Sequence, residues 1–130
     1  MKTLLPPGWP RPKGYANGIA ASGRVIVTAG VVGWNEREEF ETDDLAGQFR
    51  QILINTLAIL AEDEAGPEHI VRMTCYVTDI EAYRSGLGGI GAAWGELMGR
   101  NFPAMAVVGV TALVEPKAKI EIETTVVVPE

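Results

Sequence analysis

The sequence predicts an α+β fold, in which one mixed β-sheet carries two helices on one of its faces. Two periodicities support this prediction. Apolar and polar residues alternate along several short segments, as in strands, and apolar residues recur at three- and four-residue steps over two longer segments, as in amphipathic helices. In chain order these segments give β-β-α-β-α-β-β. We expect one domain over residues 1–130.

Residues 1–14 are expected to form an extended N-terminal arm. Four of the eight prolines lie between positions 6 and 12, and proline fits neither a helix interior nor a central strand. Two apolar runs follow, at 18–21 and 24–32, and the Ser22-Gly23 pair between them is typical of a hairpin turn. The second run is apolar on both faces, which predicts an inner strand.

Two segments are predicted to be helical. Residues 43–63 show the clearest helical spacing, with Thr42 as the expected N-cap and Gly66-Pro67 as the stop signal. A second apolar stripe runs over residues 90–98, although the glycine-rich stretch 86–91 weakens its beginning. Each helix has one broad apolar face and should therefore lie against the sheet or against the other helix.

Three further strands are predicted, over residues 71–78, 104–114 and 118–128. The second of these offers apolar side chains on both sides, but two helices can cover only one face of a sheet. An uncovered apolar sheet face promotes association. The sequence therefore predicts a homo-oligomer.

Composition excludes several classes of function. The chain has 11 basic and 17 acidic residues, a net charge of −6, so we expect no nucleic-acid partner. One cysteine, Cys75, and one histidine, His69, leave no cysteine-rich or two-histidine metal site. No phosphate loop or dinucleotide fingerprint is present, and we expect neither a metal nor an organic cofactor. No segment is typical of a membrane span or a signal peptide, so we expect a cytoplasmic protein without a membrane partner.

Several segments together resemble a known family. These are Gly14-Tyr15, the run Arg24-Val25-Ile26-Val27-Thr28-Ala29-Gly30, the segment Phe102-Pro103-Ala104, and Val114 to Glu123, which ends in Lys-Ile-Glu-Ile-Glu. With the two helices between them, they are similar to the Rid family of reactive intermediate deaminases, also called YjgF. The resemblance extends from about Gly14 to Val128, and the Phe-Pro-Ala segment with the final strand is its most specific part.

The resemblance implies a chorismate-mutase-like fold and a homotrimer in which the sheets face inward. Sites for small-molecule substrates would lie in the clefts between subunits. The better-known members hydrolyse enamines and imines to ketones and ammonia. The uncovered sheet face inferred above agrees with such an assembly.

The resemblance also implies roles for individual residues. Glu121 matches the acidic residue that positions the hydrolytic water, and Tyr15 matches a tyrosine that lines the site. Gly30 fits a position where the backbone approaches closely. Where the deaminases have an arginine that pairs with the substrate carboxylate, this chain has Met105, and a thioether cannot form that ion pair.

Met105, Val107 and Trp34 predict a more apolar pocket than in the standard members. One hypothesis is therefore an enamine or imine hydrolase whose substrate lacks a carboxylate at the usual anchor. The alternative is a non-catalytic trimer that binds a small metabolite, since Met105 and Ala29 replace polar residues of the family. A third interpretation, a ribonuclease, is disfavoured by the net charge of −6.

Overall fold

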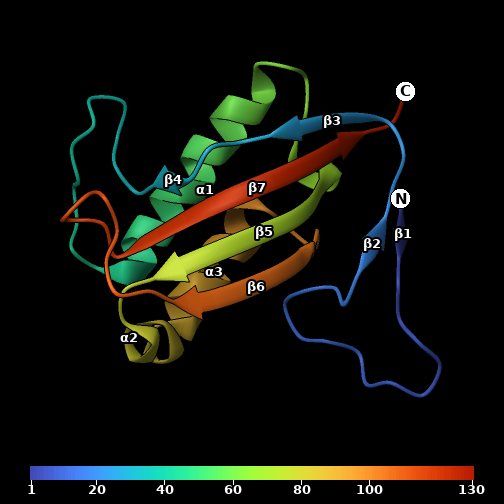
Figure 1. Ribbon diagram of the computed structural model, residues 1–130, viewed down its shortest axis with the longest axis horizontal. Helices are drawn as coiled ribbons and strands as arrows, with labels where there is room; N and C mark the ends of the chain where they lie inside the picture. Colours follow the sequence, from blue (N-terminus) through green and yellow to red (C-terminus); the bar gives the residue numbers. More distant parts are fainter.

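A layer of helices covers one face of a mixed sheet in the computed structural model, which describes all residues from 1 to 130 (Figure 1). The elements in chain order are β1 (Lys2–Thr3), β2 (Ile19–Ala20), β3 (Arg24–Val27), β4 (Val31–Val32), α1 (Leu45–Ala61), the 3₁₀ turn η1 (Pro67–His69), β5 (Ile70–Val77), α2 (Ile80–Ser85), α3 (Leu87–Leu97), β6 (Ala104–Gly109) and β7 (Ile120–Val128). The α+β class predicted from the sequence is confirmed, and a third helix, α2, accompanies the two that were expected.

The main sheet has the strand order β3-β7-β5-β6, and β4 also pairs with β7. Strands β5 and β6 are parallel, whereas β7 is antiparallel to all its neighbours. A parallel pair needs a long crossover connection, and α2 and α3 supply it. In register, Cys75 of β5 lies between Val107 of β6 and Ile122 of β7.

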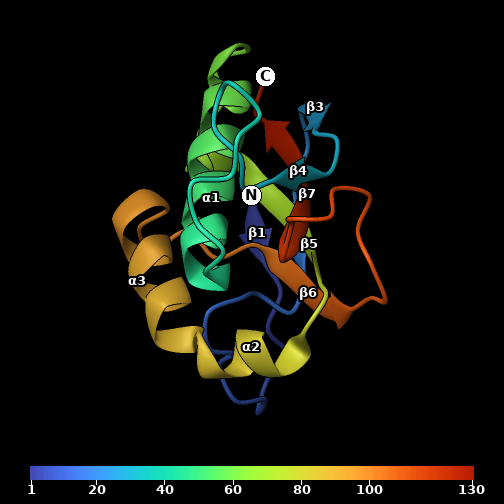
Figure 2. The same ribbon diagram turned by 90° about the vertical axis from the view of Figure 1, so that its left-hand side faces the viewer.

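The longest helix, α1, begins with a side-chain cap. Asp44 is the N-cap, and its carboxylate accepts a hydrogen bond of 2.9 Å from the Gly47 N–H. The expected cap, Thr42, instead accepts from the Asp44 N–H with its hydroxyl, so it shapes the approach to the helix. Figure 2 shows α1, α2 and α3 all on one side of the sheet.

The core lies between this helical layer and the sheet. Successive side chains of a strand point to opposite faces, and β5 and β7 are buried at alternate positions. The strand side chains that are fully buried under α1 are Met73, Cys75, Val77, Ile120, Ile122 and Val126. They meet Phe49, Ile52, Leu53 and Leu60 of α1 in one continuous cluster.

Two predictions for the first third of the chain were wrong. The runs at 18–21 and 24–32 do not form a hairpin, because β2 pairs with β1 from the N-terminal arm. The run 24–32 is not an inner strand either, since β3 and β4 lie at the edge of the sheet beside β7. Between them the chain leaves the strand conformation, and the Thr28 hydroxyl accepts a hydrogen bond from the Thr124 N–H.

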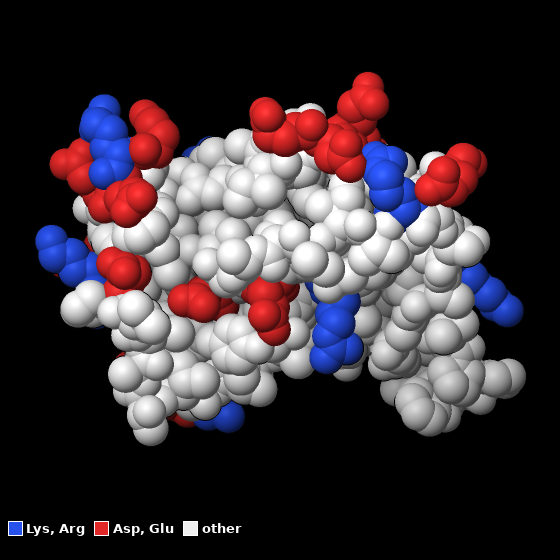
Figure 3. All heavy atoms as spheres, turned by 45° about the horizontal axis from the view of Figure 1, so that its top comes forward, with Lys and Arg blue, Asp and Glu red and all other residues white.

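The sheet face opposite the helices is uncovered, as the sequence predicted, but it is mixed rather than apolar. Val25, Val27 and Val108 are exposed on its strands. Between them, the outward side chains of β5 and β7 include Arg72, Thr74, Tyr76, Glu121 and Glu123. In Figure 3, charged side chains gather at one end and along the upper edge, with a broad area of few charges between.

A single buried glutamine connects α1 to the loop before β7. The Gln48 side chain is fully buried. Its amide nitrogen donates to the carbonyl oxygens of Thr42 and Lys117, both at 3.0 Å, and its amide oxygen accepts from the Lys119 N–H at 2.7 Å. This side chain therefore fixes the position at which β7 begins.

Replacing Gln48 with Met should destabilise the protein by about 3 kcal/mol, because the three hydrogen bonds of this buried side chain are lost. Urea unfolding followed by circular dichroism measures this change. The matched control is Gln51→Met on the same helix, whose side chain bonds only Asn55 and whose loss should cost under about 1 kcal/mol. Equal losses in the two variants would contradict the role assigned to Gln48.

Candidate functional site

A cavity of about 470 Å³ opens between α3 and the edge strand β6. Nine of the fourteen residues that line it are hydrophobic. The lining consists of Lys13, Gly14, Tyr15, Phe49, Tyr83, Leu87, Ile90, Gly91, Trp94, Gly95, Gly99, Phe102, Met105 and Val107. This size and apolar character are typical of pockets for small organic ligands.

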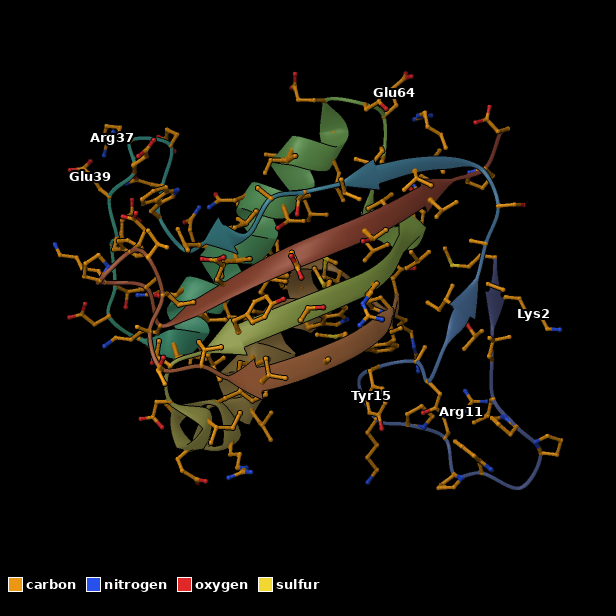
Figure 4. The ribbon with its side chains drawn as sticks, in the orientation of Figure 1. Lys2, Arg11, Tyr15, Arg37, Glu39 and Glu64 are labelled. Carbon is orange, nitrogen blue, oxygen red and sulfur yellow. The ribbon has the colours of Figure 1, made fainter.

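The N-terminal segment closes one end of the cavity. Gly14 has a φ of +81°, a conformation that favours glycine, and it turns the chain toward the start of β6. The Ala16 N–H then donates to the Pro103 carbonyl at 2.9 Å, and Ala16 forms a parallel bridge with Ala104. These backbone contacts place Tyr15 beside the first residues of β6, as Figure 4 shows.

An aromatic group forms the inner wall. The rings of Trp94 and Phe102 are stacked, with centroids 6.3 Å apart and planes inclined by 11°. The Phe49 ring of α1 also contacts Trp94, and the two ring centroids are 6.4 Å apart. The wall therefore offers a flat aromatic surface rather than polar groups.

Three of the predicted site residues meet in this cavity. Met105 and Val107 lie on β6 opposite Met73 and Cys75, so they face the helices and point into the space under α3. Tyr15 joins them from the N-terminal segment. The sequence pattern thus grouped Tyr15, Met105 and Val107 although they come from two separate parts of the chain.

Two other predicted residues meet on the opposite face of the sheet. Glu121 is half-buried on β7 and points away from the helices, in register with Tyr76. A Cβ atom built on Gly30 would lie only 2.1 Å from the Glu121 Oε2 atom. The carboxylate therefore occupies the space that the missing side chain of Gly30 leaves. Within one chain, Glu121 does not face the cavity.

The last predicted residue, Trp34, lies apart from both groups. Its ring packs against Phe40, with centroids 5.8 Å apart, and its carbonyl accepts a hydrogen bond from the Asn55 side chain. Trp34 does not line the cavity. Trp34 follows β4 and lies in the loop that leads to α1, where these contacts hold it.

Several lining residues were not identified from the sequence. Leu87 belongs to the glycine-rich stretch 86–91, which forms the first turn of α3, and Tyr83 belongs to α2, a helix that the sequence did not predict. Lys13 lines the cavity from the N-terminal arm. The signal available for Tyr83 was an Asp79 N-cap, whose carboxylate accepts from the N–H groups of Glu81 and Ala82.

No group of three or more histidine, cysteine, aspartate or glutamate side chains lies in a geometry that could hold a metal ion. None of the helices is long and apolar enough to cross a bilayer. The chemistry available at the two faces is therefore that of Glu121 on one side and of an apolar cavity on the other.

Comparison with known proteins gives a consistent result. Residues 10–128 match the family described as Endoribonuclease L-PSP. The chain belongs to the Rid/YjgF family. No functionally curated protein matches it in sequence.

Three solved structures show how widely the Rid/YjgF resemblance extends. YyfB from Yersinia pestis, a Rid family protein of unknown function, is 31% identical over 98% of both chains, with a TM-score of 0.85. The YjgF gene product of E. coli is 30% identical over 98% of both chains, with a TM-score of 0.70. Rv2704 from Mycobacterium tuberculosis is 31% identical, covers 89% of this chain and 88% of its own, and has a TM-score of 0.67.

In this Rid/YjgF chain, the only cysteine lies directly under the cavity wall and is chemically protected. Cys75 is fully buried beside Val107. Burial raises the pKa of its thiol from 9.0 to about 12. Tyr83 lines the cavity nearby, and burial, followed by the charge of a Cys75 thiolate, raises its pKa from 10.0 to about 12. Neither group is charged near neutral pH.

These shifts predict that the protein loses stability above about pH 9. Between pH 9 and 12 the unfolded chain releases the Cys75 proton and the folded chain retains it, so rising pH favours unfolding. The free energy of unfolding should fall by about 2 kcal/mol between pH 9 and pH 10.5. Urea titrations across this range measure the slope. Cys75→Ala should reduce it, and an unchanged slope in that variant would refute the assignment.

Proposed function

We propose that the chain hydrolyses an enamine or imine to a carbonyl compound and ammonia, at a site completed by a second copy of itself. The observation that carries this proposal is the placement of Glu121. Its carboxylate rests against Gly30 on the uncovered face of the sheet, where an adjoining copy can reach it. The chain belongs to the Rid/YjgF family, and the resemblance noted in the sequence implies the same reaction class.

The proposed hydrolysis needs one group that accepts a proton and later returns it. An enamine first takes up a proton from solvent on carbon and becomes an iminium ion. The oxygen of water then bonds to the C=N carbon, the electron pair of the double bond moves to nitrogen, and the Glu121 carboxylate takes a proton from the water. Glu121 next returns this proton to nitrogen, and the C–N bond breaks as the C=O bond forms. The proton of the new hydroxyl group passes to the departing ammonia. The iminium ion and water thus become a ketone and an ammonium ion.

A second copy is needed because Glu121 and the cavity lie on opposite faces of the sheet. Tyr15, Met105 and Val107 face the helices, while Glu121 faces away from them, two strands further along the sheet. Adjacent strands lie about 4.8 Å apart, so no side-chain rotation in one chain brings the Glu121 carboxylate into the cavity. We propose a homotrimer in which the open sheet face of one copy meets the cavity edge of the next.

The cavity also restricts the substrate. Met105 occupies the position from which the family resemblance expects an arginine, and its thioether offers no charge to a carboxylate next to the C=N bond. We therefore propose a substrate without a carboxylate on that carbon. The Trp94 and Phe102 wall supports a ring or another flat apolar group in its place.

The alternative is a non-catalytic trimer that binds a small metabolite. The specific observation in its favour is that no acidic side chain lines the cavity of the single chain. A ligand that raises the melting temperature without being consumed would support it. A ribonuclease activity is not proposed, because the net charge of −6 opposes binding to a polyanion.

Ammonia release from imines and enamines generated in situ tests the proposed reaction. The wild type should hydrolyse enamines that lack a carboxylate on the C=N carbon, and Glu121→Gln should lower kcat/KM by about 100-fold or more. Gly30→Ala should also lower it, because its methyl group displaces the Glu121 carboxylate. Gly88→Ala is the matched control, since a Cβ there meets no atom within 4 Å.

Met105→Arg provides a second control on substrate choice. This variant should gain activity toward 2-iminopropionate, a small imine with an adjacent carboxylate, because a guanidinium pairs with carboxylates. Wild-type hydrolysis of 2-iminopropionate as efficient as that of Met105→Arg would contradict the proposed role of Met105. No ammonia release from any substrate of the panel would favour the metabolite-binding alternative.

Mixing two inactive variants tests whether the site is shared between copies. Glu121→Gln retains the cavity, and Gly91→Trp should fill it, because Gly91 lines the cavity and has no neighbour within 4 Å of its Cβ position. Random co-refolding in equal amounts should restore about one quarter of wild-type activity, since one site in four then combines two intact halves. No recovery, with both variants folded and oligomeric, would place the whole site in one chain.

A further inference from the structure

We propose that the ligand of the cavity is an amphiphilic anion, with an apolar, ring-bearing body along α3 and a carboxylate or similar anion held at the Lys13 end. The inference deepens the proposed function, because it names the substrate class of the same site. It rests on the distribution of charge around the cavity and on the direction in which the cavity runs.

Three cationic side chains lie in the cavity or in the hollow beside it. Lys13 lines the cavity itself, and Arg11 and Arg100 line an adjoining hollow. The two spaces share Gly14, Tyr15 and Phe102 as a common wall. Figure 4 shows Arg11 and Tyr15 on the same N-terminal segment beyond the beginning of β6, with Arg11 farther from the sheet.

None of these three cations has an internal partner. The ion pairs formed by arginines use Arg24, Arg37, Arg50 and Arg84. No acidic residue lines either the cavity or the adjoining hollow. In a chain with a net charge of −6, these three unpaired cations attract an anion to the end of the cavity that adjoins the hollow.

The opposite end of the cavity is apolar. Helix α3 runs antiparallel to β6, so its first turn lies beside Val107 and its last turn lies beside Phe102. The far end is formed by Leu87, Val107 and Tyr83, and the phenol of Tyr83 has a pKa of about 12 and stays neutral. Leu87 and Gly95, which both line the cavity, are about 12 Å apart along the helix.

This length along α3 separates the cationic end of the cavity from its apolar end. A small 2-imino acid, in which carboxylate and C=N carbon are neighbours, cannot reach both the cationic rim and the apolar end. A ligand with several bonds between its anion and the far end of its ring can do so. The cavity therefore selects for an elongated molecule with one charged end.

Direct binding tests the inference without requiring turnover. We would measure dissociation constants by calorimetry for three probes: 4-phenylbutyrate, its uncharged analogue 4-phenylbutanamide, and pyruvate. The butyrate should bind about tenfold more tightly than the amide, and pyruvate should not bind measurably. Added salt should weaken binding of the butyrate and leave that of the amide unchanged.

Matched variants locate the anion site. Lys13→Met keeps the aliphatic stem and removes the charge, so it should weaken 4-phenylbutyrate binding about fivefold to tenfold without changing the amide. Arg100→Met should have a smaller effect in the same direction. Lys117→Met is the control, because Lys117 is exposed and lines neither space. Equal affinities for butyrate and amide, or no effect of Lys13→Met, would overturn the inference.

The outcomes also separate this inference from the proposed reaction. Binding of the anionic probe to Glu121→Gln with wild-type affinity, together with no ammonia release by the wild type, would support the ligand class and refute the hydrolase. Ammonia release that is unaffected by Lys13→Met would support the hydrolase and refute the ligand class. Dissociation of the oligomer in Lys13→Met would show that Lys13 pairs with another copy, which also overturns the inference.

Discussion

The alternation of side chains along the strands is the constraint on which this structure depends. Because the helices cover only one face, every strand residue either joins the core and the cavity or faces outward. Met105 and Val107 belong to the first group, whereas Glu121 belongs to the second. A shift of one residue in the register of β7 would exchange Glu121 with a core isoleucine. The separation of the two chemical halves is thus built into the pleat of the sheet.

The same separation explains why charge and apolar surface are arranged as they are. The cavity under α3 has an aromatic wall and a protected thiol behind it, so it supplies an apolar surface of defined shape rather than reactive groups. The Glu121 carboxylate, to which we assign the proton transfers, is half-buried beside Gly30. The cations of the N-terminal segment lie at the mouth, where water screens them and an incoming anion can reach them.

Local patterns predicted much of the fold but not its long-range pairings. Helix α1 and strands β5 and β7 follow from periodicity alone, because each is long enough for its pattern to be clear. Strand β2 pairs with β1 in the N-terminal arm, and β3 pairs with β7 near the end of the sequence. The turn signal at Ser22-Gly23 is local and could predict neither pairing. Tyr15, Met105 and Val107, all predicted as site residues, line one cavity. Lys13 was missed because it belongs to no periodic element, and Trp34, predicted to lie in the site, does not line the cavity of the single chain.

One turn of α1 links the two halves of the candidate site. Gln48 anchors the backbone just before β7, the strand that bears Glu121, while the adjacent Phe49 forms part of the cavity wall. Two neighbouring residues of one helix therefore contact both parts of the candidate site. A substitution that rotates α1 would move both side chains. It would therefore change the shape of the cavity and the position of the Glu121 carboxylate together.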